Sequence, residues 1–494
     1  MIPDDIRRAV DEDRTRDAGA LFVDAIARYF ESTGRGEGPV SATAGHPERR
    51  ARFDDAMPVH GKPLAEIVAR LEREFIGGAN QLSHPMYMGH QVAAPLPAAV
   101  WTDALVGALN NSVAVSEMSP TGTVVEERVI RWMCDLVGYG TGAGGTLTSG
   151  GQEASHTALL AARAAFDPEA WKRGLRGAPP VIVCGEHAHY AIARAGGELG
   201  LGTENVRPVP SKGWKMDAEA LPAMLDAIAA EGRAVMAVVA TAGHTATGSF
   251  DDIDAIGATC EERGLWMHVD GAHGASALFS ATHAARLRGI HRARTVAWDP
   301  HKLMLLPLAA GALLVRDERD LTAAFAQQAP YLFHGAEGER SPDQGTRSFM
   351  CSRRVDALKV WVAVQRYGAA GIGAIYDHIC AMAAALHGMI AERPDFAALH
   401  EPESNILCFR WTPRGITDDA TLNALNQRLR ERYNASGQGW ITSTVLGAQR
   451  VLRVTMMNPR TQESHVAALL DGLAAEGAAL LKAPAQHPRD RPQH

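Results

Sequence analysis

The chain has 494 residues, of which 46% are hydrophobic, and its 49 Lys and Arg against 56 Asp and Glu give a formal charge of −7. This composition is ordinary for a soluble globular protein, and the length suffices for two or three domains with cores of their own. The mildly acidic balance, without a dense Lys/Arg block, argues against nucleic acid or a membrane surface as a partner.

Six scattered cysteines form no CxxC pair, which is typical of reduced thiols rather than of a disulfide framework or a zinc site. The first residues interleave acids and bases, whereas a secretory signal has a basic start and a continuous apolar stretch. No segment is a run of about twenty apolar residues without charges or breakers. We therefore expect a cytoplasmic protein.

Apolar residues recur at helical spacing over residues 3–32 and 64–75, which predicts an N-terminal helical extension at 1–94 without a sheet of its own. From 95 to 370, short apolar runs such as VMAVVAT and LWMHVD alternate with helical stretches. That alternation is typical of a large α/β domain with a mainly parallel sheet.

Strand candidates between helices predict a small C-terminal α+β domain at 371–481. The Pro-rich, polar residues 482–494 predict a flexible tail.

In open α/β sheets, ligands bind beyond the carboxyl ends of the strands, so the residues that follow each predicted strand are candidates for a site. Gly150 and Gly151 lie between a strand and a helix. Paired glycines let backbone N–H groups approach an anion, and a helix N-terminus adds about half a positive charge. The turn suits a phosphate, although a tight structural connection is an equally open alternative.

Asp270 ends the apolar run LWMHVD, and a buried carboxylate requires a cationic partner. The protonated nitrogen of a pyridine ring would serve, while helix capping or pairing with an Arg is the structural alternative. Lys302 follows the strand TVAW and precedes an apolar run, where an ammonium is poorly solvated. This setting favours the free amine needed for a Schiff base, with a solvated loop as the alternative.

His189 follows the strand VIVC and supplies an imidazole that can stack on a flat ring, although a lone His in such a place is more often structural. The pairs His187/His189 and His268/His273 have no companion carboxylate at a familiar metal-ligand spacing, so we expect an organic cofactor and no metal. Together, the phosphate turn, the His, the buried Asp and the Lys describe a site for pyridoxal 5′-phosphate. Its protonated ring is an electron sink that stabilises a carbanion at Cα of an amino acid.

Several segments resemble the group II pyridoxal-phosphate-dependent amino acid decarboxylases, the family of the glutamate, aromatic amino acid, cysteine sulfinate and 2,4-diaminobutyrate decarboxylases. The resemblance runs in family order from about residue 80 to 460. It is carried by HPMYMGH, LTSGGQEASHTALLAAR, VATAGHTATGSFDD, HVDGAHGASALFS, ARTVAWDPHKLMLLPLAAGALLV, SRRVDALKVW and LRVTMMNP.

The resemblance implies the roles of individual residues. Lys302 binds the cofactor covalently, Asp270 pairs with its ring nitrogen and His189 stacks over the ring. The phosphate turn comprises Gly150, Gly151 and Gln152, with His301 beside it, and Thr245 lies near the cofactor and the substrate carboxylate. Tyr331 matches the mobile-loop tyrosine that protonates Cα after carbon dioxide leaves, which favours decarboxylation over other outcomes.

The resemblance also implies the type I, aminotransferase-like fold and a homodimer with shared active sites, in which residues 109–117 are the candidate contribution to the partner's site. HPMYMGH and MMNP favour an acidic or short polar substrate, such as glutamate, aspartate or 2,4-diaminobutyrate. The alternatives are an aromatic amino acid decarboxylase, an enzyme with the same cofactor that acts as an oxidative deaminase, a lyase or a transaminase, and a non-catalytic scaffold. Tyr331 argues against oxidative deamination, and intact Asp270, Lys302 and Tyr331 argue against the scaffold.

Three positions depart from the family pattern. His244 precedes Thr245 where a threonine is usual, and His273 stands where small or aromatic residues are common. Gln152 occupies the place of a small hydroxyl residue. We expect His244 and His273 to alter the polarity around the substrate, and the change at Gln152 leaves its phosphate role open.

Overall fold

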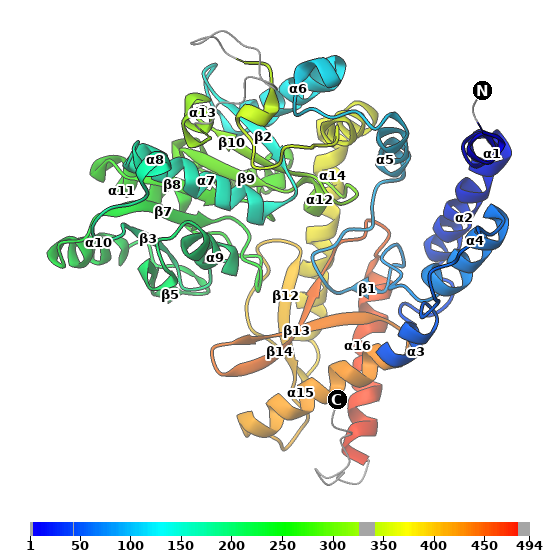
Figure 1. Ribbon diagram of the computed structural model, residues 1–494. Helices are drawn as coiled ribbons and strands as arrows, with labels where there is room; N and C mark the ends of the chain where they lie inside the picture. The colour runs from blue at the N-terminus through cyan, green and yellow to red at the C-terminus, as the bar shows by residue number, and fades with distance from the viewer. Residues whose placement is uncertain (1–2, 43, 326–340, 483–494) are drawn as a thin grey trace. The chain divides into compact units, whose positions relative to one another are not determined.

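The computed structural model describes residues 3–42, 44–325 and 341–482 (Figure 1). The chain divides into two compact units, which are described separately. The larger unit comprises the described residues of 91–384 and 400–408. The smaller unit comprises those of 1–90, 385–399 and 409–494.

The larger unit is built on a sheet of seven strands within the described residues. Strands β9, β8, β7, β3 and β4 run parallel to one another, and β10 is antiparallel to its neighbours β9 and β2. The strands lie in the order β2 (Gly144–Thr148), β10 (Gly311–Val315), β9 (Thr295–Trp298), β8 (Trp266–Asp270), β7 (Val235–Thr241), β3 (Val181–Gly185) and β4 (Val206–Val209). The apolar runs of the sequence thus form the mainly parallel sheet that they predict.

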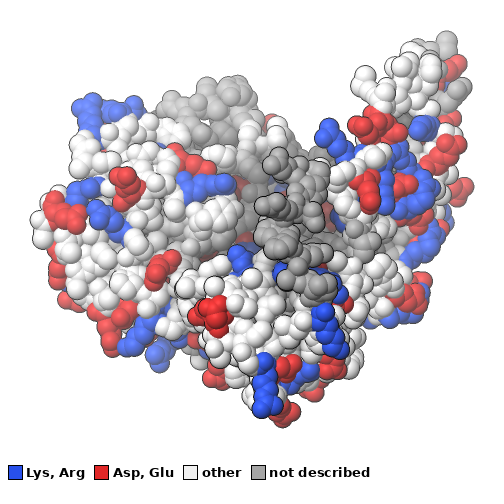
Figure 2. Space-filling view, turned by 90° about the horizontal axis from the view of Figure 1, so that it is seen from below, with Lys and Arg blue, Asp and Glu red and all other residues white. Residues whose placement is uncertain are grey.

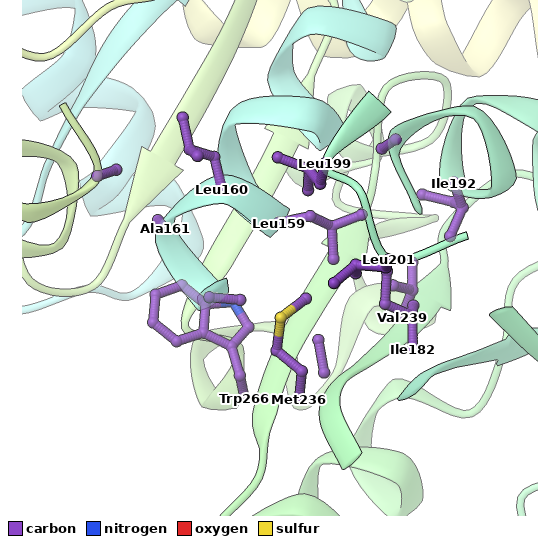
Figure 3. Close-up of a cluster of buried hydrophobic side chains, with 14 of the residues drawn as sticks. Leu159, Leu160, Ala161, Ile182, Ile192, Leu199, Leu201, Met236, Val239 and Trp266 are labelled. Carbon is purple, nitrogen blue, oxygen red and sulfur yellow. The ribbon is translucent and has the colours of Figure 1, made fainter. Parts of the chain in front are cut away.

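Helix α7 (Gly151–Phe166) packs on this sheet and contributes to a buried apolar cluster. Figure 3 shows Leu159 of α7 among Leu201, Met236 of β7 and other side chains of the cluster. Leu159 is fully buried, and burying a leucine side chain stabilises the folded state by about 1.5–3 kcal/mol. This packing fixes the position of α7, and therefore of its N-terminus, against the strand ends.

The larger unit also contains a short hairpin, β5 (Ser211–Lys212) with β6 (Lys215–Met216). The unit has further α-helices, several of which lie around the sheet, whereas α5 (Pro97–Leu109) stands apart from it (Figure 1). They are α5, α6 (Pro120–Val137), α8 (Ala170–Arg173), α9 (Tyr190–Glu198), α10 (Leu221–Ala230), α11 (Ile253–Arg263), α12 (Pro300–Leu303), α13 (Arg319–Ala324) and most of α14 (Ala357–Ala391).

The sheet of the smaller unit joins segments from both ends of the chain. Its strand order is β1 (Tyr87–Met88), β13 (Trp440–Leu446), β14 (Gln449–Thr455), β12 (Ile406–Trp411) and β11 (Phe396–Ala398); of β12, residues 409–411 belong to the smaller unit. Because β1 pairs in parallel with β13, the predicted N-terminal extension adds a strand to the C-terminal sheet. The domain limits at residues 94, 370 and 481 stay predictions.

The helices of the smaller unit include the N-terminal ones that the apolar spacing predicts. The α-helices that lie wholly in this unit are α1 (Asp4–Asp11), α2 (Arg16–Gly34), α3 (His46–Ala51), α4 (Leu64–Arg70), α15 (Asp419–Ala435) and α16 (Glu463–Lys482). By length and composition alone, α14 and α16 would each be able to cross a membrane, a test that buried core helices also pass. On the face shown in Figure 2, acidic and basic side chains are interspersed.

Candidate active site

The predicted site residues of the larger unit lie at one edge of its sheet. Strands β3, β7, β8 and β9 are parallel, so their carboxyl ends meet at this edge, and β2 ends there too. The turn before α7 follows β2, His189 follows β3, Thr245 follows β7, Asp270 ends β8, and His301 and Lys302 follow β9. This edge is where ligands of open α/β sheets bind.

The turn at the start of α7 lies directly against the ends of β8 and β9. The backbone N–H of Gly151 donates to Asp299 Oδ2 at 2.9 Å. A Cβ atom on Gly151 would lie 2.6 Å from the Cβ of Ala272, and one on Gly150 would lie 3.2 Å from His301 Cε1. Gly151 therefore requires glycine for this close approach and Gly150 favours it, which brings the positive end of α7 to the site.

Gln152 lies in the first turn of α7, but its side chain is already engaged. Its Oε1 accepts a hydrogen bond from Arg194 Nη1 at 3.2 Å. The residue is therefore suited to offer an anion its backbone N–H, as any residue in the first turn of a helix does. The side-chain amide of Gln152 stands in place of a small hydroxyl residue, and it does not need to contact the phosphate itself.

The carboxylate of Asp299 joins the lysine to the glycine turn. Its Oδ2 lies 3.2 Å from Lys302 Nζ and 3.5 Å from His301 Nε2, and it accepts the Gly151 hydrogen bond as well. Asp299 is only 1% exposed, and its Oδ1 has no hydrogen-bond partner among the described residues. Sequence reasoning did not single out Asp299, although a carboxylate directly after an apolar strand is the signal that identified Asp270.

Asp270 and His189 interact electrostatically. Asp270 is 8% exposed, and its Oδ1 accepts from the backbone N–H of Ala272 at 3.2 Å. Burial lowers the pKa of His189, and Lys302 lowers it further, while Asp270 and Asp299 act in the opposite direction. The His189 ring, which also accepts from the N–H of Ala191 at 3.3 Å, is therefore neutral at neutral pH and suited to stacking.

His301 is a buried, neutral partner of this cluster. Burial lowers its pKa; the charge of Asp299 opposes this effect and that of Lys302 adds to it. Its Nδ1 accepts from the backbone N–H of Ala310 at 3.2 Å, which leaves Nε2 facing the site. His301 thus carries a hydrogen-bonding nitrogen beside the phosphate-suited turn.

Thr245 lies in the turn 242–250 after β7, which is tied to the end of β8. The N–H of Ala242 donates to Asp270 O at 2.9 Å, and the N–H of Gly274 donates to Ala242 O at 3.0 Å. Thr245 is half-buried in this turn, next to the buried His244. Tyr331, the predicted proton donor, lies outside the described residues.

This set of groups fits pyridoxal 5′-phosphate. A glycine turn at a helix N-terminus suits its phosphate, Asp270 suits its ring nitrogen, Lys302 supplies a primary amine and His189 a neutral ring. The buried Asp299 carboxylate has Lys302 Nζ and the Gly151 N–H as partners. An α/β fold with these groups at the strand ends defines the class of pyridoxal-phosphate enzymes.

Comparison with known proteins identifies the family within this class. Residues 47–412 match the pyridoxal-dependent decarboxylase conserved domain, and the chain belongs to this family. It is 33% identical to human acidic amino acid decarboxylase GADL1, over 85% of this chain and 82% of that protein. It is 32% identical to L-2,4-diaminobutyrate decarboxylase of Rhizobium meliloti, over 85% and 83% of the two chains.

Among solved structures, mouse CSAD has a TM-score of 0.88 and 29% sequence identity, with 94% of this chain and 99% of that one covered. The predicted type I fold, the cofactor and the family are confirmed. The protein is a pyridoxal-phosphate-dependent amino acid decarboxylase, a carboxy-lyase.

Proposed function

We propose that the substrate is an acidic or short polar L-amino acid, such as glutamate, aspartate or 2,4-diaminobutyrate, which is converted to its amine and carbon dioxide. The names of the two relatives above support this choice, since one is an acidic amino acid decarboxylase and the other a diaminobutyrate decarboxylase. The segments HPMYMGH and MMNP favour the same subgroup.

We assign the binding roles as the sequence predicts them. Lys302 Nζ is the atom that binds the cofactor covalently, and the carboxylate of Asp270 holds a proton on the ring nitrogen. His189 stacks on the ring, the N–H groups of the turn bind the phosphate, and His301 Nε2 lies beside it. The turn comprises Gly150, Gly151 and Gln152.

The proposed chemistry needs two further groups of the chain. When bound, the cofactor supplies an electron sink that stabilises negative charge at Cα of the amino acid. The hydroxyl of Thr245 orients the substrate carboxylate. The hydroxyl of Tyr331 then donates a proton to Cα, which makes the amine rather than the aldehyde the product.

One observation carries these assignments. A single carboxylate oxygen, Asp299 Oδ2, lies 3.2 Å from Lys302 Nζ and 2.9 Å from the Gly151 nitrogen. The Lys302 amine and the glycine turn, which are 151 residues apart in sequence, are therefore close enough for one small molecule to contact both. Such juxtaposition supports covalent attachment and phosphate binding of the same cofactor.

We further propose a cytoplasmic homodimer with shared active sites and without nucleic acid or membrane partners. Trp101, Leu105 and Leu109 of α5 support the dimer because they share one helix face and are 39%, 52% and 57% exposed. Such an apolar stripe is typical of a surface that a second subunit covers. Residues 109–117, which follow this stripe, remain the candidate contribution to the partner's site.

The test combines one variant with a substrate panel. Borohydride treatment of the wild-type protein should fix the cofactor to Lys302, and Lys302→Ala should lose both this label and nearly all turnover. Lys212→Ala is the matched control, because Lys212 is exposed and pairs with Glu219 at 3.6 Å. A label on another lysine would overturn the assignment.

Mass spectrometry of amine, aldehyde and carbon dioxide from a panel of amino acids then tests the reaction. Turnover of acidic or short polar substrates to amines is expected. Turnover of aromatic amino acids alone would refute the substrate proposal. Aldehyde as the main product would remove Tyr331 from its assigned role.

A further inference from the structure

The side chains of His244 and Asp251 are arranged as a buried ion pair beside the candidate site. Its side chain is 1% exposed, and that of its partner Asp251 is fully buried. The ring Nε2 lies 2.8 Å from Asp251 Oδ1, and Nδ1 lies 3.1 Å from the backbone carbonyl oxygen of His187. Both ring nitrogens thus face oxygen acceptors.

The partners of the ring determine its charge. A carbonyl oxygen can only accept, so Nδ1 must carry a proton. Asp251 also accepts from the N–H groups of Met216 and Thr241, each at 2.7 Å, and these donors stabilise an ionised carboxylate. An ionised carboxylate accepts from Nε2 as well, and an imidazole that donates from both nitrogens is a cation.

Electrostatics agree with this geometry. Burial lowers the pKa of His244, but the hydrogen bond and charge of Asp251 outweigh burial, with help from the His187 carbonyl and from Asp270, so that the pKa is raised overall. Asp251 and Asp270 are the carboxylates that act on the ring, the second without a hydrogen bond. The nearby Cys184 thiol stays neutral, since burial and Asp251 raise its pKa to about 12.

The cation ties together segments that carry site residues. His187 is two residues before His189, and His244 directly precedes Thr245. Asp251 closes the turn 242–250 by binding the N–H of Thr241 at the end of β7, and it also binds the β5–β6 hairpin at Met216. A threonine, which the family resemblance leads one to expect at position 244, is too short to make both contacts of the imidazole.

We propose that His244 is a positioning residue, whose imidazolium, paired with Asp251, holds the His189 segment and the Thr245 turn in fixed relation around the cofactor. This inference rests on the roles proposed for His189 and Thr245. It adds a residue that acts through them and does not touch the cofactor in this assignment. It also makes cofactor binding depend on the charge of one buried histidine.

The first test reads the protonation directly. Neutron diffraction from crystals of the wild-type holoenzyme at pH 7 should show deuterium on both ring nitrogens of His244. A single deuterium would overturn the inference and would leave the proposed function unaffected. The result needs no variant and therefore does not depend on whether a variant folds.

The second test uses His244→Thr and His244→Gln, with His283→Gln as the matched control. His283 likewise lies beside a carboxylate, 3.9 Å from Asp377, but it is only part-buried and lies on other segments. For the two His244 variants we expect cofactor binding, followed by fluorescence titration, to weaken roughly tenfold or more, and the visible circular dichroism of the bound cofactor to change. His283→Gln should match the wild type in both measurements.

The pH profile separates positioning from simple structural support. Wild-type cofactor affinity should fall as the pH rises through the raised pKa of His244, and this step should be missing in His244→Gln. A profile that is the same in the variant and the wild type, or wild-type affinity in both His244 variants, would refute the proposal. Failure of borohydride to label Lys302 in the wild type would instead refute the proposed function.

Discussion

At the scale of single residues, two buried histidines of the larger unit show how their partners decide their charge. His244 faces a carboxylate and a carbonyl, which favour the cation. His268 is fully buried between two hydroxyl groups, with Nδ1 3.0 Å from Thr295 Oγ1 and Nε2 3.3 Å from Ser155 Oγ. Hydroxyl groups donate or accept as needed, so a neutral ring is satisfied there, and burial lowers the pKa of His268 to about 4.

The lowered pKa of His268 predicts that this residue makes an acid-sensitive contribution to the stability of the fold. Because the folded-state pKa of His268 lies below its unfolded value, the unfolded chain binds the additional proton first as the pH falls. The contribution is intact above about pH 6.5 and is lost progressively down to about pH 4, by about 3 kcal/mol in total. Urea unfolding at pH 7 and at pH 4.5 should therefore show a smaller pH dependence for His268→Asn than for the wild type.

His60→Asn is the control, because His60 is exposed. It should retain the full wild-type pH dependence. Parallel losses of unfolding free energy in wild type and His268→Asn would contradict the assignment of a neutral, buried ring.

At the scale of elements, the junction between β2 and α7 is where we propose that the phosphate binds. The core around Leu159 fixes α7, and the backbone at Gly151 touches Asp299. No side chain fits between the helix start and the end of β8, since a Cβ on Gly151 would meet Ala272. The positive end of the helix is thereby held against the lysine segment.

Gly151→Ala should displace this junction. The added Cβ would lie 2.6 Å from the Cβ of Ala272, so the turn must shift, at a cost of about 1–3 kcal/mol in unfolding free energy. Cofactor affinity should fall by about tenfold or more, measured by titration of the cofactor-free protein. Gly142→Ala is the control, since a Cβ there meets nothing within 4 Å; equal affinities of the two variants would contradict the proposed phosphate turn.

At the scale of the whole molecule, the exposed apolar face of α5 bears on assembly. Leu105 is 52% exposed in the centre of this face. A dimer would remove its side chain from water, and a charge there would oppose association because it would have to be desolvated without a partner. The shared active sites that we propose make assembly a condition for activity.

Leu105→Glu should therefore sediment as a single chain of 52.8 kDa with little turnover, whereas the wild type should sediment at twice that mass. Val445→Glu carries the same charge at a position of β13 that is 50% exposed, and it should remain dimeric and active. A wild-type protein that is active at the mass of one chain would refute the dimer.

The sequence by itself determined the strands of the large sheet other than β4, the order of the chemical motifs and the family. Apolar runs and strand-terminal polar residues are local patterns, so the sheet edge that brings Asp270, Lys302 and Gly151 together followed from the rule for parallel strands. The same patterns predicted the cofactor, because its phosphate, ring nitrogen and aldehyde each require a different kind of residue.

Only the tertiary structure decided which groups share a partner. The meeting of Lys302, His301 and Gly151 on Asp299, the engagement of Gln152 by Arg194 and the pairing of His244 with Asp251 are side-chain contacts between segments, and no local pattern encodes them. The addition of β1 to the C-terminal sheet has the same origin. Hydrogen bonds and charges depend on distances of a few ångströms, and these distances exist only once distant segments have packed against one another.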